Sequence, residues 1–125
     1  HFVSSEGLTI LVGRGNWQND SLTSKVAQNH DFWLHVAEYS GSHVVLRNPN
    51  RRSTVSEPSL LEAAQLAAYF SQARNAPKVE VHYTKKKFVA KPKGGKPGVV
   101  RLSRYHSIVV NPCVPTSVSR FSSLK

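Results

Sequence analysis

Basic residues crowd the segment 85–101, which reads KKKFVAKPKGGKPGVVR and holds no acidic residue. Its six lysines and one arginine are Lys85, Lys86, Lys87, Lys91, Lys93, Lys96 and Arg101. Cationic groups spaced along a loop contact successive phosphates of a nucleic-acid backbone, through interactions that depend on salt and not on base sequence. The alternative is a solvated basic segment with no partner.

The Gly95-Lys96 pair raises the question of a nucleotide-binding P-loop. That motif needs a glycine five residues before its Gly-Lys pair and a serine or threonine directly after it, which cradle phosphates and hold magnesium. Here Ala90 stands at the first position and Pro97 at the second. The motif therefore fails at both ends. Lys91, Lys93 and Lys96 instead lie in a stretch whose prolines and glycines predict a bent loop.

Six histidines and one cysteine prompt a search for a metal site or a nucleophile. His35 and His43 fall on neighbouring strand candidates, but no HExxH or CxxC pattern supplies further ligands. Cys113 has no histidine or asparagine partner marked by the sequence, and the acidic residues are scattered. We therefore expect no enzyme activity, no metal and no cofactor, and we expect the histidines to pack or to form hydrogen bonds.

The positive charge is confined to the last part of the chain. Residues 1–75 carry six basic and six acidic residues, whereas residues 76–125 carry eleven basic residues against Glu80, which accounts for the net charge of +10. This asymmetry predicts a polyanionic partner, with RNA or DNA favoured over an anionic membrane. No apolar run has the length of about 18 residues that a membrane-spanning helix needs.

Several strands are expected around this basic segment. A hairpin is predicted over 2–13, and further strands over 31–37, 43–47, 78–84, 98–103 and 106–110, the last two paired about Arg104-Tyr105. Alternation in the 31–37 strand sends Phe32, Leu34 and Val36 to one face, and Trp33 and His35 to the other.

Two helices are expected beside the strands. The long one covers 57–74, starting either with a capping box of Ser59 and Glu62 or at Ser56 ahead of Pro58. Its predicted apolar face comprises Leu60, Ala63, Ala64, Ala67 and Phe70. The short one follows a cap at Asn19 or Asp20, with Leu22 and Val26 on one face. The expected fold is α/β (α+β): a mixed, largely antiparallel sheet packed with one long and one short helix.

Four separated segments of the chain resemble one known family. They are LTILVGRGNWQND, DFWLHVAEYSGSHVVLR, LLEAAQLAAYFSQAR and KVEVHYTKKKFVAKPKGGKPGVV, in the family's order and spacing from Phe2 to about Pro112. On these residues the chain resembles the NFACT-R domain, the RNA-binding module of NFACT proteins, some of which are labelled fibronectin-binding. The resemblance implies a non-catalytic module that binds tRNA and ribosomal RNA on stalled large ribosomal subunits, in ribosome-associated quality control.

The resemblance also implies site residues. The matching motif positions that we expect to contact RNA are Arg14, Asn16, Trp33, His35, His43, Arg47, Lys91, Lys93 and Lys96, joined by the flanking Lys85, Lys86, Lys87 and Arg101. Trp33 and His35 on one strand, with His43 and Arg47 on the next, would form one patch whose edge Arg14 and Asn16 reach. The alternative for Trp33 and His35 is a buried, hydrogen-bonded structural pair.

The resemblance sets the expected organisation as well. Residues 1–112 would form the domain and 113–125 a C-terminal tail, in the C-terminal fragment of a bacterial-type protein whose other NFACT domains are partners. The expected compartment is the cytoplasm, with plastids as the other place where bacterial-type members occur, and no membrane partner is expected. The competing hypothesis is a protein–protein or adhesion module, in which the basic face meets an acidic protein surface.

Overall fold

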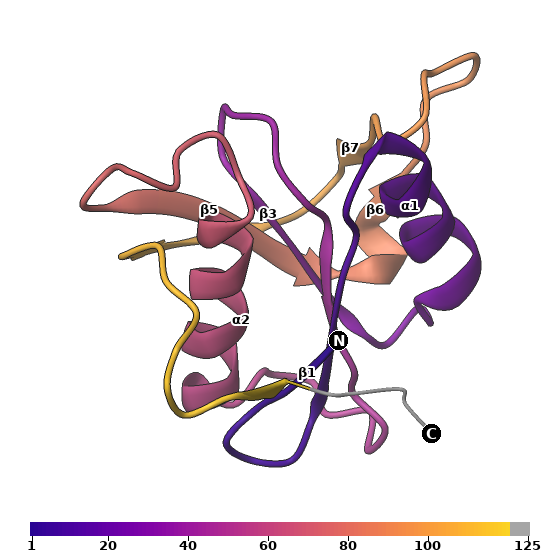
Figure 1. Cartoon of the computed structure of the whole chain (residues 1–125). Helices are drawn as coiled ribbons and strands as arrows, with labels where there is room; N and C mark the ends of the chain where they lie inside the picture. Colours follow the sequence, from indigo (N-terminus) through magenta and orange to yellow (C-terminus); the bar gives the residue numbers. More distant parts are fainter. Residues whose placement is uncertain (121–125) are drawn as a thin grey trace, which may run out of the picture.

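A seven-stranded sheet forms the middle layer of the fold in the computed structural model, which describes residues 1–120 (Figure 1). From one edge to the other, its strands are β8 (His106–Val110), β5 (Val79–Lys85), β3 (Phe32–Val36), β4 (Val44–Leu46), β2 (Thr9–Val12), β1 (Phe2–Val3) and β9 (Ser119–Arg120). Each neighbouring pair runs antiparallel. The predicted α+β class, with a largely antiparallel sheet and one long and one short helix, is confirmed.

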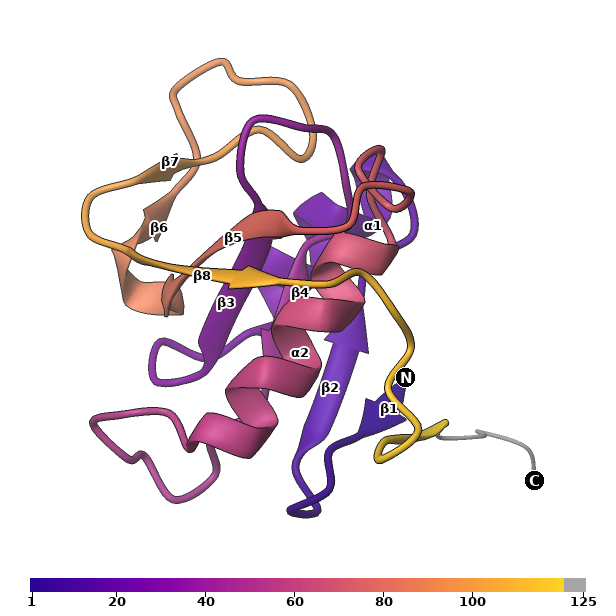
Figure 2. The same ribbon diagram turned by 90° about the vertical axis from the view of Figure 1, so that its left-hand side faces the viewer.

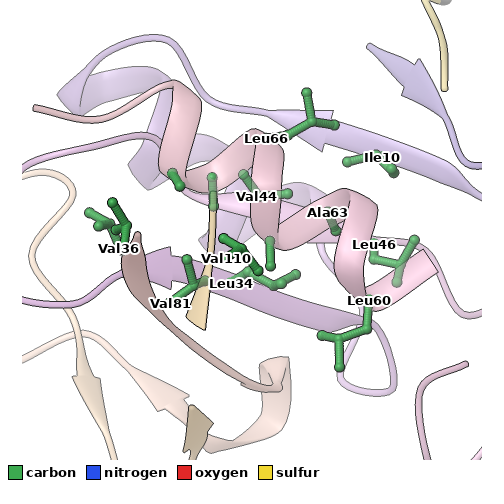
Figure 3. Packing of buried hydrophobic residues seen from close by; sticks show 14 of the residues in the cluster. Ile10, Leu34, Val36, Val44, Leu46, Leu60, Ala63, Leu66, Val81 and Val110 are labelled. Atoms are coloured by element: carbon green, nitrogen blue, oxygen red, sulfur yellow. The ribbon is translucent and has the colours of Figure 1, made fainter. Parts of the chain in front are cut away.

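The long helix α2 (Glu57–Tyr69) covers one face of this sheet (Figure 2). Ala63, Ala64 and Ala67 are fully buried, and their small side chains let the helix lie close to the strands. Phe32, Leu34 and Val36 of β3 belong to the same core, as their alternation predicts. Figure 3 shows Leu34 and Val36 there. This core anchors the central strands that carry the candidate site on their opposite face.

Of the two predicted starts of α2, the one at Ser56 ahead of Pro58 is confirmed, whereas the capping box and the predicted end of the helix are not. The capping box is wrong: α2 begins after Ser56, while the Ser59 hydroxyl donates to Glu6 and the Glu62 carboxylate accepts from the Ser5 amide, 2.9 Å away. Tertiary partners in the β1–β2 turn have replaced local capping. The helix also ends at Tyr69 and not at residue 74, because the chain that follows bonds to the β3–β4 turn.

The opposite face of the sheet is covered by the short helix α1 (Asn16–Ser21), which continues into the π-helix η1 (Leu22–Val26). The predicted cap at Asn19 or Asp20 is wrong, because both lie inside α1 and use their side chains for contacts with distant parts of the chain. Leu22 is buried while Val26 is exposed, so the wider turn of η1 separates them. A second core forms here, around Trp33, Val45 and Leu11.

The basic segment forms a small ribbon beside α1. After β5, the 3-10 helix η2 (Lys86–Phe88) leads to β6 (Val89–Ala90), which pairs with β7 (Arg101–Leu102). The predicted hairpin of 98–103 with 106–110 is therefore wrong. Instead β8 pairs with β5, which buries Val110 and packs Ile108 against the main core.

Residues 111–120 return along the molecule to the far edge of the sheet. Val114 and Val118 pack against the main core, Ser117 donates to the Glu62 carboxylate, and β9 pairs with β1. The predicted domain boundary at residue 112 stays a prediction, and the last part of the predicted tail, residues 121–125, lies outside the described residues. No helix within residues 1–120 has the length and apolar character to cross a membrane.

Candidate nucleic-acid interface

Three aromatic rings meet on the α1 side of the central strands. The Trp33 ring stacks on His35 with centroids 5.9 Å apart, and His43 meets both rings edge-on, at 5.1 Å from Trp33 and 5.4 Å from His35. The predicted neighbourhood of these three side chains is thus present. Trp33 is only 1% exposed, whereas His35 is partly exposed. The geometry favours the structural alternative for Trp33 and leaves His35 facing a pocket.

A chain of hydrogen bonds fixes the His43 ring. Trp33 Nε1 donates to Thr23 Oγ1 over 3.0 Å, and Thr23 Oγ1 lies 2.7 Å from His43 Nδ1. His43 Nε2 lies 3.0 Å from the carbonyl oxygen of Gly98, which can only accept. The ring therefore carries its proton on Nε2, and the Thr23 hydroxyl donates to Nδ1. Because Trp33 occupies a lone pair of Thr23, the hydroxyl proton is directed to His43.

Burial keeps both histidines neutral. Desolvation, with the His35 charge as a second cause, lowers the pKa of His43 from 6.5 to about 4. Burial likewise lowers the pKa of His35. At neutral pH the two rings therefore act as flat, uncharged surfaces and hydrogen-bonding groups, and not as cations.

The basic loop, residues 91–100, is docked onto the sheet and α1 by this arrangement. His43 holds the Gly98 carbonyl, and Asp20 of α1 bonds both Lys91 Nζ at 2.9 Å and the Gly98 amide at 3.4 Å. The hydrogen bond from Lys91 is the largest cause of the lowered pKa of Asp20. Gly98 has φ +84°, and an added Cβ would meet the Asn16 carbonyl at 3.3 Å. Only glycine suits that conformation and that close approach.

The other two lysines of the loop take no part in this anchoring. Lys93 and Lys96 are exposed, and within residues 1–120 neither forms an ion pair, in contrast to Lys91. The loop projects from the body of the domain at the upper right of Figure 1 and at the top of Figure 2. A docked loop that carries two exposed lysines without an ion pair in residues 1–120 is suited to lie along a phosphate backbone.

A pocket of about 700 Å³ lies between the basic loop and the sheet. Trp33, His35 and His43 line it from the sheet, and Lys96 lines it from the loop. It thus gathers five of the predicted site residues, the fifth being Asn16 of α1. The pocket exists because the loop is held over the strands by Gly98.

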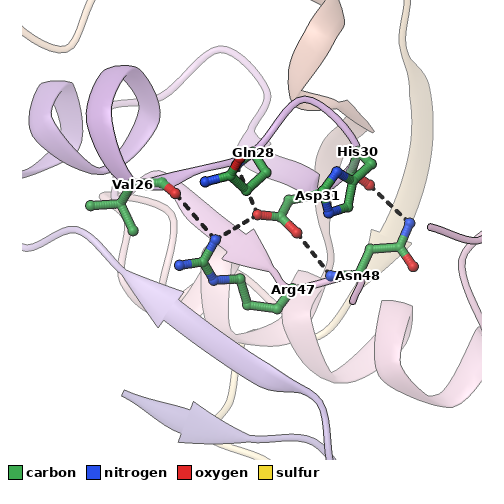
Figure 4. A network of polar contacts seen from close by, with 6 residues as sticks. All are labelled: Val26, Gln28, His30, Asp31, Arg47 and Asn48. Carbon is green, nitrogen blue, oxygen red and sulfur yellow. Dashed lines mark hydrogen bonds and ion pairs between the residues drawn. The ribbon is translucent and has the colours of Figure 1, made fainter. Parts of the chain in front are cut away.

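Arg47 does not join this group. Its guanidinium bonds the Asp31 carboxylate at 2.8 Å and the Val26 carbonyl at 3.1 Å, at the other end of β4 from His43 (Figure 4). Asp31 is buried and also accepts from the amides of Gln28 and Asn48, each at 2.9 Å. Arg47 therefore completes a buried polar network, although its side chain remains 32% exposed.

The remaining predicted cations spread along the ribbon. Lys85 and Lys87 line a second pocket of about 520 Å³ beside Phe88. Arg104 lies over the Phe88 ring, with its Cζ 5.1 Å from the ring centroid. Lys86 borders a small cavity with Lys91, and Arg101 is exposed on β7. Arg14 lies apart from these, with its Cζ 4.6 Å from the centre of the Phe70 ring.

Three residues important to this geometry were not among the predicted contacts. Thr23 and Asp20 anchor His43 and the basic loop, and Arg74 lies over Tyr69 close to Arg14. Asp20 is the last residue of LTILVGRGNWQND, one of the four segments on which the family resemblance rests. Nothing in the local sequence marks Thr23 or Arg74. Within residues 1–120 no group of three potential ligands is placed to hold a metal ion.

Comparison with known proteins finds relatives that match most of this chain. Residues 1–102 match the NFACT protein RNA binding domain. The Rqc2 homolog RqcH of Bacillus subtilis is 45% identical over 117 residues, covering 94% of this chain and 20% of that protein. The Rqc2 homolog RqcH of Streptococcus suis is 40% identical over 112 residues, covering 89% of this chain and again 20% of that protein.

A more distant relative and a solved structure also match this chain. A ribosome quality control complex subunit NEMF homolog of Drosophila melanogaster is 29% identical over 82 residues, which is 66% of this chain and 8% of that protein. The solved C-terminal part of the fibronectin/fibrinogen-binding protein from Streptococcus suis superposes with a TM-score of 0.82 at 39% identity, over 90% of this chain and 44% of that one. The chain spans about a fifth of the length of its bacterial relatives.

Proposed function

The chain belongs to the family of NFACT protein RNA-binding domains, and from this premise we propose that it is a non-catalytic module that binds RNA through its basic loop. The observation that carries the proposal is the pairing pattern of the loop lysines. Lys91 forms an ion pair with Asp20 of the same chain. Lys93 and Lys96, in contrast, are exposed and form no ion pair within residues 1–120. A docked loop presents these cations at fixed positions, which lowers the entropy lost on binding a backbone.

The test is RNA binding by a variant that lacks these two charges. Lys93→Gln/Lys96→Gln should bind a transfer RNA about tenfold more weakly than the parent at low salt, because two phosphate contacts are lost. Between about 50 and about 200 mM salt, its affinity should also fall less steeply than that of the parent. Filter binding or fluorescence anisotropy measures both quantities.

The matched control is Arg51→Gln/Arg52→Gln, which removes the same amount of charge from an exposed loop before α2. In Figure 2 this loop lies at the opposite end of the molecule from the basic loop. Equal weakening by the two variants would mean that net charge, and not the basic loop, determines binding. Affinity that is insensitive to salt would contradict phosphate contacts altogether.

The finer proposal concerns the RNA and its setting. We propose that the module contributes to binding tRNA and ribosomal RNA on stalled large ribosomal subunits, within a longer cytoplasmic or plastid protein that carries the other NFACT domains. The name of the Drosophila relative supports this, since it refers to a ribosome quality control complex. Competition between tRNA and isolated large subunits for the unsubstituted chain would test it. If both bind one shared site, each should displace the other, and if they bind independent sites, both should bind at once.

A second candidate is a protein-binding or adhesion module. The observation in its favour is the likeness to a streptococcal protein described as fibronectin- and fibrinogen-binding. Capture of a protein partner should then survive nuclease treatment and should again depend on Lys93 and Lys96. If nuclease abolishes the capture, RNA is the bridge and this candidate falls.

A further inference from the structure

The pocket under the basic loop continues into a second, shallower depression. This depression has a volume of about 400 Å³ and reaches Arg14 and Arg74. The same five residues line both spaces, which are Asn16, Asn19, Ser40, Gly41 and Gln72. A single groove therefore runs from Lys96 at one end to Arg74 at the other.

Local packing creates the far end of the groove. The amide of Ser42 donates to the Phe70 carbonyl and that of Gln72 to the Ser40 carbonyl, each over 2.9 Å. An added Cβ at Gly41 would lie 2.7 Å from Ser71 Cβ, so the two turns meet this closely only with glycine at that position. This contact brings the turn after α2, and with it Arg74, to the side of the groove.

Arg14 and Arg74 are held at this end by adjacent aromatic rings. The Arg14 Cζ lies 4.6 Å from the centroid of the Phe70 ring, and the Arg74 Cζ lies 4.2 Å from that of Tyr69. The centroids of the two rings are 5.0 Å apart. Both arginines are exposed, and within residues 1–120 neither forms an ion pair. Stacking leaves the edges of a guanidinium free, and those edges match the geometry of a phosphate.

The loop end of the groove has a different character. His35, neutral through burial, and the exposed Tyr39 offer flat ring surfaces, and His82 stands opposite His35 on β5. Glu38, which also lines the pocket, has φ +65° and adds a carboxylate. Rings beside a hydrogen-bond acceptor suit the face and the amino edge of a base, and a base reaches such a pocket only when it is unpaired.

We propose that this groove binds a short unpaired stretch of RNA, with one base in the pocket beside His35 and Tyr39 and a backbone phosphate on Arg14 and Arg74. The inference rests on the proposed RNA binding and adds the form of the RNA and a second set of contacts. The strand then passes from Lys96 across the turn at Gly41 to the two arginines.

A purely structural role for the arginines has a different consequence. They lie near the C-terminal end of α2, where a cation is favoured by the helix dipole. If that were their only role, removing them would lower the thermal unfolding midpoint and leave RNA affinity unchanged.

The experiment compares Arg14→Gln/Arg74→Gln with the control Arg51→Gln/Arg52→Gln on two probes, a single-stranded oligoribonucleotide and the same strand in a duplex. For the single strand, the groove variant should bind about fivefold more weakly, and the slope of log affinity against log salt should shrink by about 0.7 for the lost phosphate. For the duplex, the groove variant and the control should bind equally. The unfolding midpoints of all variants should stay well above the temperature of the binding assay, so that weaker binding does not reflect loss of folded protein.

Tyr39→Ala provides a variant that does not rely on the arginines. Loss of base stacking should weaken single-strand binding by about tenfold and leave duplex binding unchanged. The proposal is overturned if both groove variants bind the single strand like the control, or lose affinity equally for both probes. Weak binding by Lys93→Gln/Lys96→Gln with normal binding by the groove variants overturns this inference alone. Salt-insensitive binding by every variant overturns the proposed function itself.

Discussion

At the scale of single residues, His43 joins the sheet to the basic loop. Its neutral ring accepts from Thr23 and donates to the Gly98 carbonyl, so the sheet, η1 and the loop meet at one side chain. The sequence motifs placed Trp33, His35 and His43 together correctly, because alternation decides which face of a strand a residue occupies. They placed Arg47 with them incorrectly, because a face does not specify which end of the strand meets the loop.

The lowered pKa of His43 makes stability depend on pH. The unfolded chain binds a proton near pH 6.5 and the folded one near pH 4, so folding is favoured above this window and weakened as the pH falls through it. Between pH 7 and pH 5, the free energy of unfolding should decrease by about 2 kcal/mol from His43. Urea unfolding at several pH values measures this decrease.

His43→Gln should flatten this dependence, whereas a change at the exposed His106 should leave it intact. His35, whose pKa is also lowered, contributes in the same direction, so some slope should remain in the His43 variant. An unchanged slope in that variant would show that His43 is not held neutral.

Gly41→Ala should separate the two turns that form the groove. The added methyl would overlap Ser71, and overpacking of this kind costs about 1–3 kcal/mol. We expect a lower unfolding midpoint together with weaker binding of single-stranded RNA, because Arg74 moves with its turn. Ser21→Ala, at an exposed position of α1 outside the groove, should change neither quantity. Normal RNA binding by a destabilised Gly41→Ala protein would contradict the link between this turn and the groove.

At the scale of elements, the basic ribbon depends on contacts that local sequence does not reveal. Composition identified the strand candidates, and β3, β4, β5 and β8 lie close to their predicted ranges. The partners of β7 and β8 were predicted wrongly because short strands pair wherever burial is greatest, and that depends on distant residues. The start of α1 was predicted wrongly for the same reason. The Asn19 side chain accepts from the His43 amide, and the Asp20 side chain accepts from the Gly98 amide of the basic loop.

Docking of the loop can be tested with a matched glycine pair. Gly94 and Gly98 both have positive φ, at +72° and +84°, but only Gly98 lies against another element. Alanine at either position adds about 1 kcal/mol of backbone strain or more, and only Gly98→Ala should also release the loop from Asn16 and His43. We therefore expect faster amide hydrogen exchange over 95–100 and weaker RNA binding in Gly98→Ala. Equal behaviour of the two variants would indicate that the loop is not docked.

At the scale of the whole molecule, residues 111–120 supply the strand at one edge of the sheet. Residues 111–120 cross the α2 side and add β9 beside β1, as Figure 2 shows. The charge asymmetry along the chain drew attention to the β6–β7 ribbon, which carries the basic loop. It could not show the groove, because Arg14 and Arg74 belong to the half of the sequence with no net charge.

Truncation tests how far the folded unit extends. A chain that ends at residue 112 loses the packing of Val114 and Val118 and the hydrogen bond from Ser117 to Glu62. We expect its free energy of unfolding to be lower by about 2 kcal/mol or more than that of a chain that ends at residue 120. Equal stability of the two chains would confirm a domain boundary at residue 112.

The most direct test of the central claim is lysine acylation with and without bound RNA, read out by mass spectrometry. Lys93 and Lys96 should lose most of their reactivity when RNA is bound, because phosphates cover their ammonium groups. The exposed Lys25 and Lys78, outside the basic loop, should react as before. Unchanged reactivity of Lys93 and Lys96 in a chain saturated with RNA would contradict the account.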